Sequence, residues 1–472
     1  MTPLNLFPAP PDWAGLELQT ADFGDRRLTR RLATLVTQLA SQPATSVPHA
    51  TGSWAAAKAA YRFWSSPHVS SAAILEPHAQ RTLQRCSQYA TVLVVQDTTT
   101  LDFTHHPATQ NLGPIGGSAY SRGLKLHSAL ALSPDGLPLG LLHHHLWARD
   151  PETVGLKHQC RQRQTSEKES QRWLTALIQT QHMMPPEVQM VTVADREADI
   201  YDLFALERPA HSHLLIRATY NRRVEHPTKH LWPLMQQTQV AGEMTVEVGR
   251  GHDHPARQAR VSVRWTKLKL EPPGHRKQRR RFASIPLCGL LVEEVEPPEG
   301  ISPISWLLLT TLCIETWNDA VQAVEWYTRR WQIERFHHVL KSGCRVEHLQ
   351  LETRERLERA IATYCLVAWR LLWLTYAARL HPEASCNIAL SRAEWQVLAS
   401  HMQGTRGPVQ TAPSLAQAVR WIAELGGFLG RTSDGAPGVQ VLWRGWRRLQ
   451  DMAETWRLLR PNGPDPGESS YG

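Results

Sequence analysis

The sequence predicts an α/β fold that lies between two largely helical segments. Two apolar runs typical of buried strands, at 91–96 and 188–194, each end at an aspartate. A helical pattern at about 167–181 lies between these runs. Strands that alternate with helices are typical of an α/β domain, and 472 residues are enough for two or three domains.

Two helices are expected near the N-terminus. Between Phe23 and Ser41 apolar residues recur at helical spacing, and arginines crowd the first turns. The stretch from Trp54 to Trp64 is rich in alanine, a strong helix former. The cations of these helices form either an ordinary solvated surface or a DNA-binding surface. The cations concerned are Arg26, Arg30, Lys58 and Arg62.

The α/β region contains further elements. Additional strand patterns lie at 124–132, 136–147 and 213–221. The segment after Asp195 has a helical pattern. Three consecutive histidines, His143 to His145, lie in a strand pattern where neighbours face opposite sides, so we expect a structural role rather than a metal site. Residues from about 225 to 303 are β-like and punctuated by prolines, which indicates an insertion.

Helices are expected toward the C-terminus. The most apolar stretch, 361–378, contains Arg370 and barely reaches the length of a membrane span, so we expect a buried helix and no membrane partner. The chain beyond Leu380 is mostly helical with a glycine-rich break. It also holds tryptophans that we expect to pair two protomers, namely Trp443, Trp446 and Trp456.

The composition is that of a globular protein. The chain is 42% hydrophobic and 20% charged, which excludes a collagen or a low-complexity disordered protein. Its seven cysteines include no C-x-x-C pair, so we expect buried thiols in a reducing cytoplasm. The first fifteen residues have neither the basic region nor the apolar core of a signal peptide.

The positive charge is concentrated in one segment. The chain has 52 Lys and Arg against 43 Asp and Glu, a net charge of +9. Residues 255–281 hold ten of the cations and a single acid, Glu271, which equals the surplus of the whole chain. Within this segment, 261–270 alternates apolar with polar or basic residues, as a strand with a basic face does. A solvated loop is the alternative, but the strand pattern favours a polyanion as partner.

One helix, predicted over about 318–340, carries the most specific group of residues. The four residues are Tyr327, Arg330, Glu334 and Lys341. In a helix that turns by 100° per residue, they fall in a narrow arc on one face. A carboxylate beside two cations and a phenol suits a site that holds a metal and steers a phosphate backbone. The alternative is a helix surface stabilised by ion pairs such as Arg330 with Glu334.

The spacing Y-x-x-R-x-x-x-E-x-x-x-x-x-x-K resembles the YREK signature of cut-and-paste DDE transposases from bacterial insertion sequences, of the Tn-five type. Ordered matches to this family extend along nearly the whole chain. They are FGDRRLTRR, AAYRFW, QDTTTLDF, EKES, ADREADIY, WLLLTT, YTRRWQIERFHHVLKSG, LGGF and WRGW.

The resemblance implies a ribonuclease H-like catalytic domain interrupted by a β-rich insertion, with helical N-terminal and C-terminal domains. The implied domains are 1–70 for binding transposon ends, 71–380 for catalysis with the insertion at about 225–303, and 381–472 for dimerisation. The implied partners are double-stranded DNA, as transposon ends and as target, and a second copy of the chain in a synaptic complex. The implied location is the bacterial cytoplasm, at the nucleoid.

By the same resemblance, Asp97, Asp195 and Glu334 form the DDE triad. Phosphodiester cleavage and strand transfer need an activated water or 3′-hydroxyl and a stabilised leaving oxygen, which two Mg²⁺ ions about 3.5 to 4 Å apart can provide. Asp97 would bridge the ions and the other two acids would complete one each, with Mn²⁺ as a substitute metal. Glu197 and Asp199 are alternatives to Asp195, although acids in a first helical turn usually serve the helix dipole.

The resemblance also implies DNA contacts. Trp306 matches a tryptophan that stacks on a base flipped out at the cleavage site, and Arg217 matches an arginine that contacts the strand end. Trp331 lies inside the signature helix with Tyr327, Arg330 and Lys341. His338 departs from the family, because the relatives carry a lysine there, and we expect a weakened or pH-dependent DNA contact.

Two other functions remain open at this level. One is a related DDE nuclease that lacks strand transfer, and the other is a DNA-binding regulator that pairs ends without chemistry. The intact set of three acids argues against the regulator.

Overall fold

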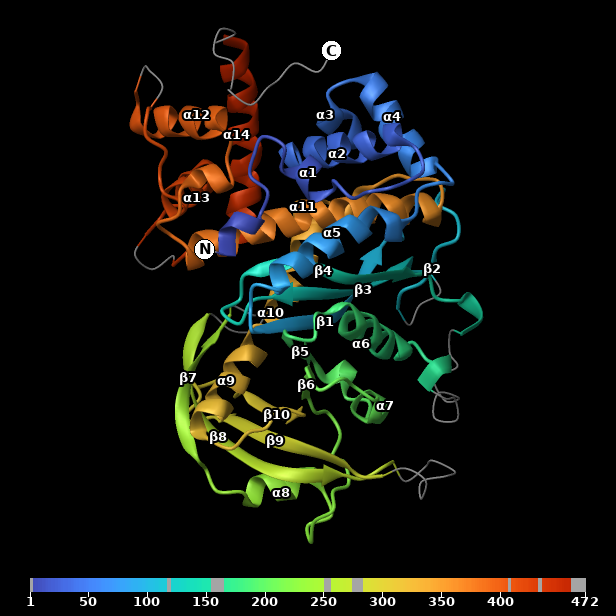
Figure 1. Cartoon of the computed structure of the whole chain (residues 1–472), viewed down its shortest axis with the longest axis vertical. Helices are drawn as coiled ribbons and strands as arrows, with labels where there is room; N and C mark the ends of the chain where they lie inside the picture. Colours follow the sequence, from blue (N-terminus) through green and yellow to red (C-terminus); the bar gives the residue numbers. More distant parts are fainter. Residues whose placement is uncertain are drawn as a thin grey trace.

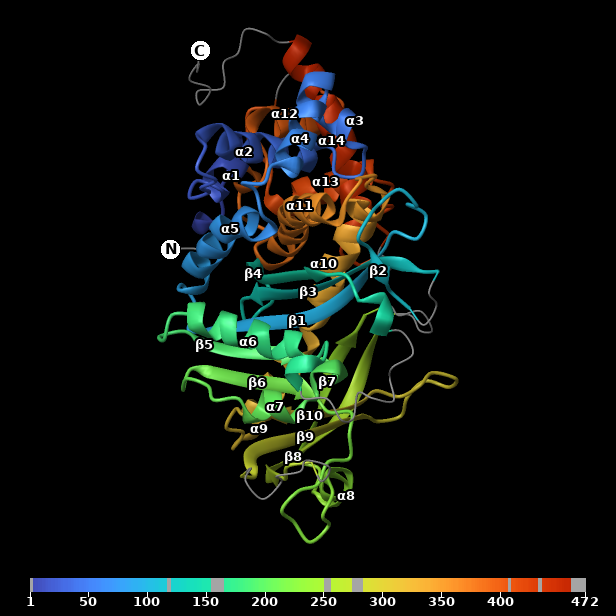
Figure 2. The ribbon, with the colours of Figure 1, turned by 90° about the vertical axis from the view of Figure 1, so that its right-hand side faces the viewer.

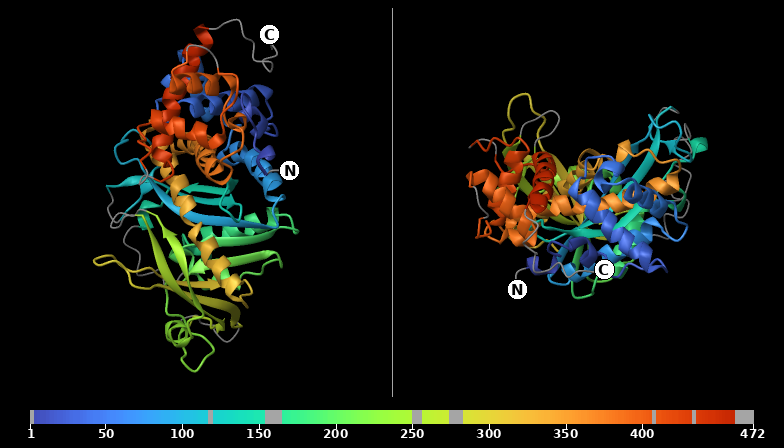
Figure 3. Two further views of the ribbon diagram at one scale, coloured as in Figure 1. Left: turned by 90° about the vertical axis from the view of Figure 1, so that its left-hand side faces the viewer. Right: turned by 90° about the horizontal axis from the view of Figure 1, so that it is seen from above.

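The computed structural model describes residues 3–116, 120–153, 165–249, 256–273, 283–405, 409–431 and 435–459. Along its longest axis the molecule is helical at one end, mixed in the middle and β-rich at the other end (Figure 1). The N-terminal and C-terminal helices lie side by side at the helical end (Figures 1 and 3). The sequence-predicted α/β region with helical flanks is confirmed.

The N-terminal region is made of short helices. They are α1 (Trp13–Glu17), α2 (Arg26–Ser41), α3 (Val47–Thr51), α4 (Trp54–Ser65) and α5 (Ser71–Cys86). Asp25 caps α2 by accepting a hydrogen bond from the Arg27 amide, and the predicted apolar face of this helix is buried. The two predicted helices correspond to α2 and α4. Helix α3 lies between them, and neither α3 nor α5 was predicted.

The central feature is a ten-stranded mixed sheet. Its strands are β1 (Thr91–Asp102), β2 (Gly113–Pro114), β3 (Arg122–Leu132), β4 (Pro138–Trp147), β5 (Gln189–Ala194), β6 (Ser212–Arg217), β7 (Gly242–Val248), β8 (Arg257–Leu270), β9 (Ile285–Glu294) and β10 (Ser305–Thr310). The order is β2-β3-β1-β5-β6-β10-β9-β8-β7, with β4 paired to β3 (Figure 2). Strands β1, β5 and β6 are parallel, and helices cover them, as in a ribonuclease H-like fold.

The remaining helices connect or cover these strands. They are α6 (Gln171–Met183), α7 (Tyr201–Ala205), α8 (Leu231–Gln237), α9 (Trp317–Thr328), α10 (Trp331–His338), α11 (Arg354–Leu380), α12 (Arg392–Gln403), α13 (Leu415–Leu425) and α14 (Val439–Leu459). Single 3₁₀ turns lie at Pro3–Leu6, Pro151–Thr153, Thr165–Glu167, Arg196–Ala198, Val346–His348 and Cys386–Ile388. Helices α5 and α11 pack on β4, and α10 packs on β1 and β3.

Helix α11 contains the stretch predicted to be a buried helix. By length and composition it could cross a membrane, but 94% of its most apolar window is buried inside the protein. It lies between the helical end and the sheet (Figure 1). The prediction of a core helix is confirmed.

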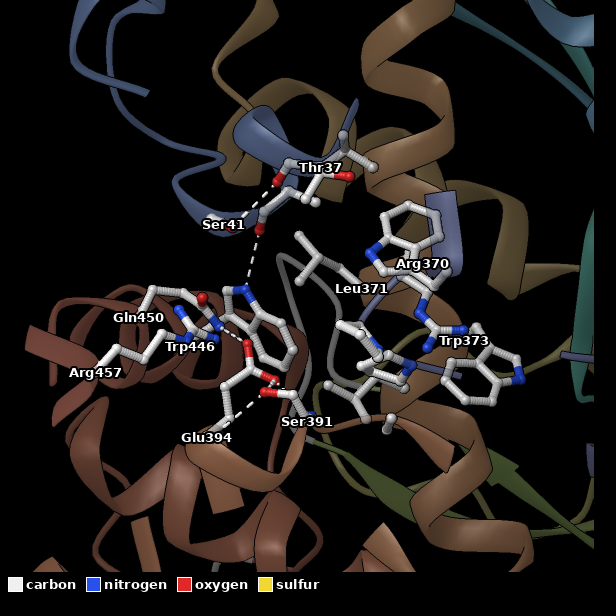
Figure 4. Close-up of a pocket in the computed structure, with 17 residues that line it drawn as sticks. Thr37, Ser41, Arg370, Leu371, Trp373, Ser391, Glu394, Trp446, Gln450 and Arg457 are labelled. Atoms are coloured by element: carbon white, nitrogen blue, oxygen red, sulfur yellow. Dashed lines mark hydrogen bonds between the residues drawn. The ribbon is translucent and has the colours of Figure 1, made fainter. Parts of the chain in front are cut away.

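The C-terminal helices pack against the N-terminal ones. The indole N–H of Trp446 donates a hydrogen bond to the Ala40 carbonyl at 2.9 Å. A cavity of about 240 Å³ lies at this junction. Figure 4 shows Trp446 and Glu394 on one side of it and Arg370 on the other. Trp446 therefore contacts its own protomer, and its predicted role in pairing two protomers stays a prediction.

The helix predicted over 318–340 is not continuous. Helix α9 ends at Thr328, and the amides of Arg329 and Arg330 bond three residues back rather than four. Helix α10 then runs into a π-helical turn over Val339–Gly343. A uniform 100° per residue therefore does not hold from Tyr327 to Lys341, and the predicted single arc is wrong.

Strand β1 does not end at Asp97, as the sequence suggested, but continues to Asp102. The predicted buried thiols are also only partly correct. Cys313 is exposed, and Cys160 lies outside the described residues.

The predicted insertion extends the main sheet, because β9 pairs with β10 and β8 pairs with β9. Strand β8 is the predicted basic strand, but each of its described cations forms an ion pair. The pairs are Arg257–Glu294, Arg260–Glu296, Arg264–Glu293, Lys267–Glu315 and Lys269–Glu225. The free basic face was therefore a wrong prediction for this strand, since nearby acids neutralise it. The other cations of the segment, Arg276, Lys277, Arg279, Arg280 and Arg281, lie outside the described residues.

Candidate catalytic centre and DNA-contacting surface

Strand pairing brings Asp97 and Asp195 together. Strands β1 and β5 are parallel neighbours, and Val95 pairs with Val193. The two aspartates are each two residues further along, so the same register places them next to one another at one edge of the α/β core. Asp195 directly follows the carboxyl end of β5, whereas Asp97 lies within β1.

Asp97 is a largely buried carboxyl whose side chain is 18% exposed. Its Oδ1 accepts a hydrogen bond from the Thr98 amide at 2.8 Å. Burial, together with the charges of Asp195 and Glu334, raises the pKa of Asp97 to about 7, against the opposing effects of Thr98 and Arg330. Asp195 and Glu334 therefore both lie within electrostatic range of Asp97.

Asp195 caps the 3₁₀ turn at Arg196–Ala198, where its Oδ1 accepts a hydrogen bond from the Glu197 amide at 2.9 Å. The two alternative acids are already engaged. The Glu197 carboxylate pairs with Arg172 at 2.6 Å. The buried Asp199 carboxylate accepts hydrogen bonds from the Thr219 and Tyr220 amides and from Arg222. These contacts favour Asp195 as the second acid.

Glu334 lies in the first turn of α10, which packs on β1, and its Oε1 accepts a hydrogen bond from Arg330 at 2.7 Å. Within the described ranges, no three His, Cys, Asp or Glu side chains are arranged as a complete metal-ligand group. The donor set nevertheless fits a hard divalent cation, because it consists of carboxylates. The Glu334 carboxylate is paired with Arg330, whereas the pKa of Asp97 is raised mainly by burial.

A stability prediction follows from the raised pKa of Asp97. In the unfolded chain an Asp carboxyl has a pKa of about 3.9. Between about pH 4 and 7 the folded state therefore binds more protons than the unfolded state, and the free energy of unfolding falls as the pH rises. Asp97→Asn removes this charge and is expected to raise the unfolding temperature of EDTA-treated protein by several degrees at pH 8.

The same comparison at pH 4 is expected to show a much smaller gain, since Asp97 is then mostly protonated in the folded state. Thermal unfolding at the two pH values measures this. Asp102→Asn is the control, because this exposed acid on the same strand has a lowered pKa. A gain that is equal at both pH values would rule out the electrostatic cause.

The predicted DNA-contacting residues of this region form one cluster beside the acids. The Trp306 and Tyr327 rings meet edge to face with centroids 5.3 Å apart. Arg217 donates to the Ser305 carbonyl at 2.9 Å. The guanidinium of Arg330 lies 5.0 Å from the ring centroid of Trp331. Strands β6 and β10 and the segment from α9 to α10 thus bring these aromatic and cationic side chains together.

The two tryptophans of the cluster differ in exposure. Trp331 is 44% exposed and can meet a ligand directly. Trp306 is 8% exposed, so stacking on a flipped base requires its ring to be uncovered when DNA binds. The role of Trp306 stays a prediction.

Lys341 and His338 contact the protein itself. The Lys341 ammonium donates to the Thr100 carbonyl at 2.9 Å and lies 3.3 Å from the Glu347 carboxylate. The His338 ring lies 5.5 Å from that of Trp443, and burial lowers its pKa. Trp443 is therefore packed within the protomer, contrary to its predicted role between protomers.

Sequence reasoning missed two residues of the centre. His337 is buried beside Asp97, with its Nδ1 3.8 Å from the carboxylate, and its Nε2 lies 3.3 Å from the Ser128 hydroxyl. Burial lowers its pKa to about 3. Arg172 lies at the start of α6 and contacts the residues that follow both aspartates. The EKES motif, which ends two residues before Arg172, was the available signal.

The predicted cations of the N-terminal helices are exposed, and none of them forms an ion pair with a described residue. They are Arg26, Arg30, Lys58 and Arg62. Trp54 at the start of α4 is 76% exposed, one helical turn before Lys58. An exposed, unpaired cationic surface with an aromatic side chain is suited to a nucleic acid.

Sequence models of three families match the chain in order. "Transposase DNA-binding" matches residues 10–69, "Transposase DDE domain" matches 159–370, and "Transposase Tn5 dimerisation domain" matches 366–463. Asp195 and Glu334 lie inside the DDE match, and Asp97 precedes it.

Among solved structures, a cryo-EM structure of the piggyBac transposase synaptic complex with hairpin DNA shares 9% identity over 98% of this chain and 82% of that chain. The TM-score between the two structures is 0.35, which is too low to establish a shared fold. The three family matches cover a DNA-binding, a catalytic and a dimerisation domain and together span most of the chain. The chain therefore belongs to the Tn5-like DDE transposases, enzymes that bind DNA, form dimers and depend on divalent metal ions.

Proposed function

We propose that this transposase moves its own element by a cut-and-paste reaction in the bacterial cytoplasm, at the nucleoid. It binds the terminal inverted repeats, nicks them, forms and resolves a hairpin, and inserts the ends into target DNA. The observation that carries the proposal is the register that places Asp97 beside Asp195, with the helix of Glu334 packed over the same strand.

Asp97, Asp195 and Glu334 are proposed to hold two Mg²⁺ ions, for which Mn²⁺ can substitute. When bound, the ions activate the attacking oxygen and stabilise the leaving oxygen. The three carboxylates would hold the ions. Arg330, whose guanidinium donates to Glu334, would be free to meet a phosphate oxygen if Glu334 turned to a metal. Tyr327, Trp331, Arg217 and Lys341 would position the strand end.

The terminal regions are proposed to do the recognition and assembly. Residues 1–70 bind the ends, 71–380 carry the chemistry, and 381–472 pair two protomers in a synaptic complex. Since Trp443 is buried within the protomer and Trp446 is partly buried there, the exposed Leu458 and Leu459 at the end of α14 are better candidates for the contact between protomers.

Incubation of the protein with Mg²⁺ and DNA that carries the flanking repeats of its own locus tests the proposal. Nicked ends, hairpins and integrated products are expected, resolved on denaturing gels. Nicks without integration would indicate a DDE nuclease. Binding of the repeats without cleavage would indicate a regulator.

End selection gives a prediction for the N-terminal helices. Charge removal at Arg26, Arg30, Lys58 and Arg62 is expected to weaken binding of the cognate end, measured by gel shift. Loss of a base contact costs roughly 1 to 3 kcal/mol of binding free energy at particular positions of the end sequence. Loss of a phosphate contact weakens binding to all DNA alike. Deletion of residues 1 to about 65 is expected to remove the preference for cognate over scrambled ends.

The paired cations of β8 serve as controls, and Arg264→Gln is expected to leave this preference unchanged because Arg264 already pairs with Glu293. Circular dichroism checks that each variant is folded. Unchanged discrimination after the deletion would move end recognition to another part of the chain.

A further inference from the structure

Arg172 connects the segments that carry the first two predicted acids. Its Nε donates to the Thr98 hydroxyl at 2.7 Å, and its Nη2 donates to the Glu197 carboxylate at 2.6 Å. Its Nη1 donates to the Glu169 carbonyl at 2.8 Å. All three guanidinium nitrogens therefore make hydrogen bonds.

The contacted residues in turn hold the aspartates. The Thr98 amide donates to Asp97 at 2.8 Å, and the Glu197 amide donates to Asp195 at 2.9 Å. Each aspartate is thus linked to Arg172 through one residue. Two neighbouring carboxylates repel one another when both are charged, so hydrogen bonds that link their segments hold them at a fixed separation.

A direct contact of Arg172 with DNA is disfavoured by its environment. Its side chain is 12% exposed and lies over the Trp147 and Trp173 rings. A phosphate would have to displace the bonds that the guanidinium already makes. A simpler alternative is that Arg172 only anchors the start of α6. That role does not explain why Arg172 bonds to the segments of both aspartates.

We propose that Arg172 is a positioning residue that sets the separation of Asp97 and Asp195 and thereby the affinity of the centre for divalent metal. The inference rests on the proposed triad. Loss of residues that orient metal ligands typically weakens metal binding about 10- to 100-fold. A lysine cannot reproduce the fork of bonds, because it presents a single point charge.

The test measures by calorimetry how tightly Mn²⁺ binds to the full chain, which is held in complex with a duplex whose end is already cut. Arg172→Gln is expected to weaken Mn²⁺ binding about tenfold or more. Arg172→Lys is expected to recover only part of the loss. Cleavage by Arg172→Gln on uncut ends is expected to approach the parent rate at saturating metal, whereas end binding stays within about twofold of the parent.

Arg149→Gln is the matched control. Arg149 forms a bidentate pair with the Glu169 side chain in the same segment, but it contacts neither Thr98 nor Glu197. A loss of metal affinity no larger in Arg172→Gln than in this control would overturn the proposal. Asp97→Asn distinguishes a failure of the proposed role of Arg172 from a failure of the proposed triad. If it abolishes Mn²⁺ binding and Arg172→Gln does not change it, only the role of Arg172 fails. If Asp97→Asn also binds normally, the triad fails.

Discussion

Replacement of Asp97, Asp195 or Glu334 by alanine is expected to abolish strand cleavage and to leave end binding nearly intact. Metal ligation needs the carboxylates, whereas most contacts to phosphates come from Lys and Arg side chains elsewhere. Gel-shift and cleavage assays on the same preparations measure both properties. The effect is expected to be complete for Asp97, because its carboxyl lies within electrostatic range of both other acids.

Two exposed acids near the predicted triad in the sequence are suitable controls. Asp102 is an exposed residue at the end of β1, and Glu325 is an exposed residue of α9, nine positions before Glu334. Asp102→Asn and Glu325→Gln are expected to cleave as the parent does. Full cleavage by any one alanine variant of the three predicted acids would remove that residue from the triad.

The parts of the fold that the sequence predicted are those in which local pattern and burial agree. Strand β5 is an apolar run that is buried on both faces, and α2 has a single apolar face, so composition alone identifies them. The parallel pairing of β1 with β5 is seen only in the fold, because β2, β3, β4 and α6 lie between them in the chain. This pairing brings Asp97 and Asp195 together.

The features that were missed depend on contacts between distant residues. No proline or glycine marks the break at Arg329–Arg330, so the helical pattern continues through it in the sequence. The cations of β8 are neutralised largely by acids on other strands or loops, which a count within one segment does not include. Arg172 is one of many arginines in the sequence, and only the fold shows that it reaches the segments of both aspartates.

Trp306→Ala is expected to slow hairpin formation about ten- to a hundredfold and first-strand nicking much less. A strand end can attack its partner only in a distorted duplex, and an aromatic surface that stacks on the extruded base contributes roughly 1 to 3 kcal/mol. Nicking needs the acids and a bound end but no extruded base. Single-turnover assays that separate nicked from hairpin products measure the two rates.

Because Trp306 is buried, a control must separate loss of stability from loss of base stacking. Trp306 packs on Tyr327 and is 8% exposed, and Trp326 on α9 is 6% exposed, so each is expected to cost stability when it is truncated. Trp326→Ala is expected to lower the unfolding temperature without changing the ratio of hairpin formation to nicking. Trp306→Phe keeps an aromatic face and is expected to restore much of the hairpin rate. If Trp306→Ala slows both steps equally, or behaves as Trp326→Ala does, Trp306 is a core residue and another side chain, with the exposed Trp331 the first candidate, takes the base.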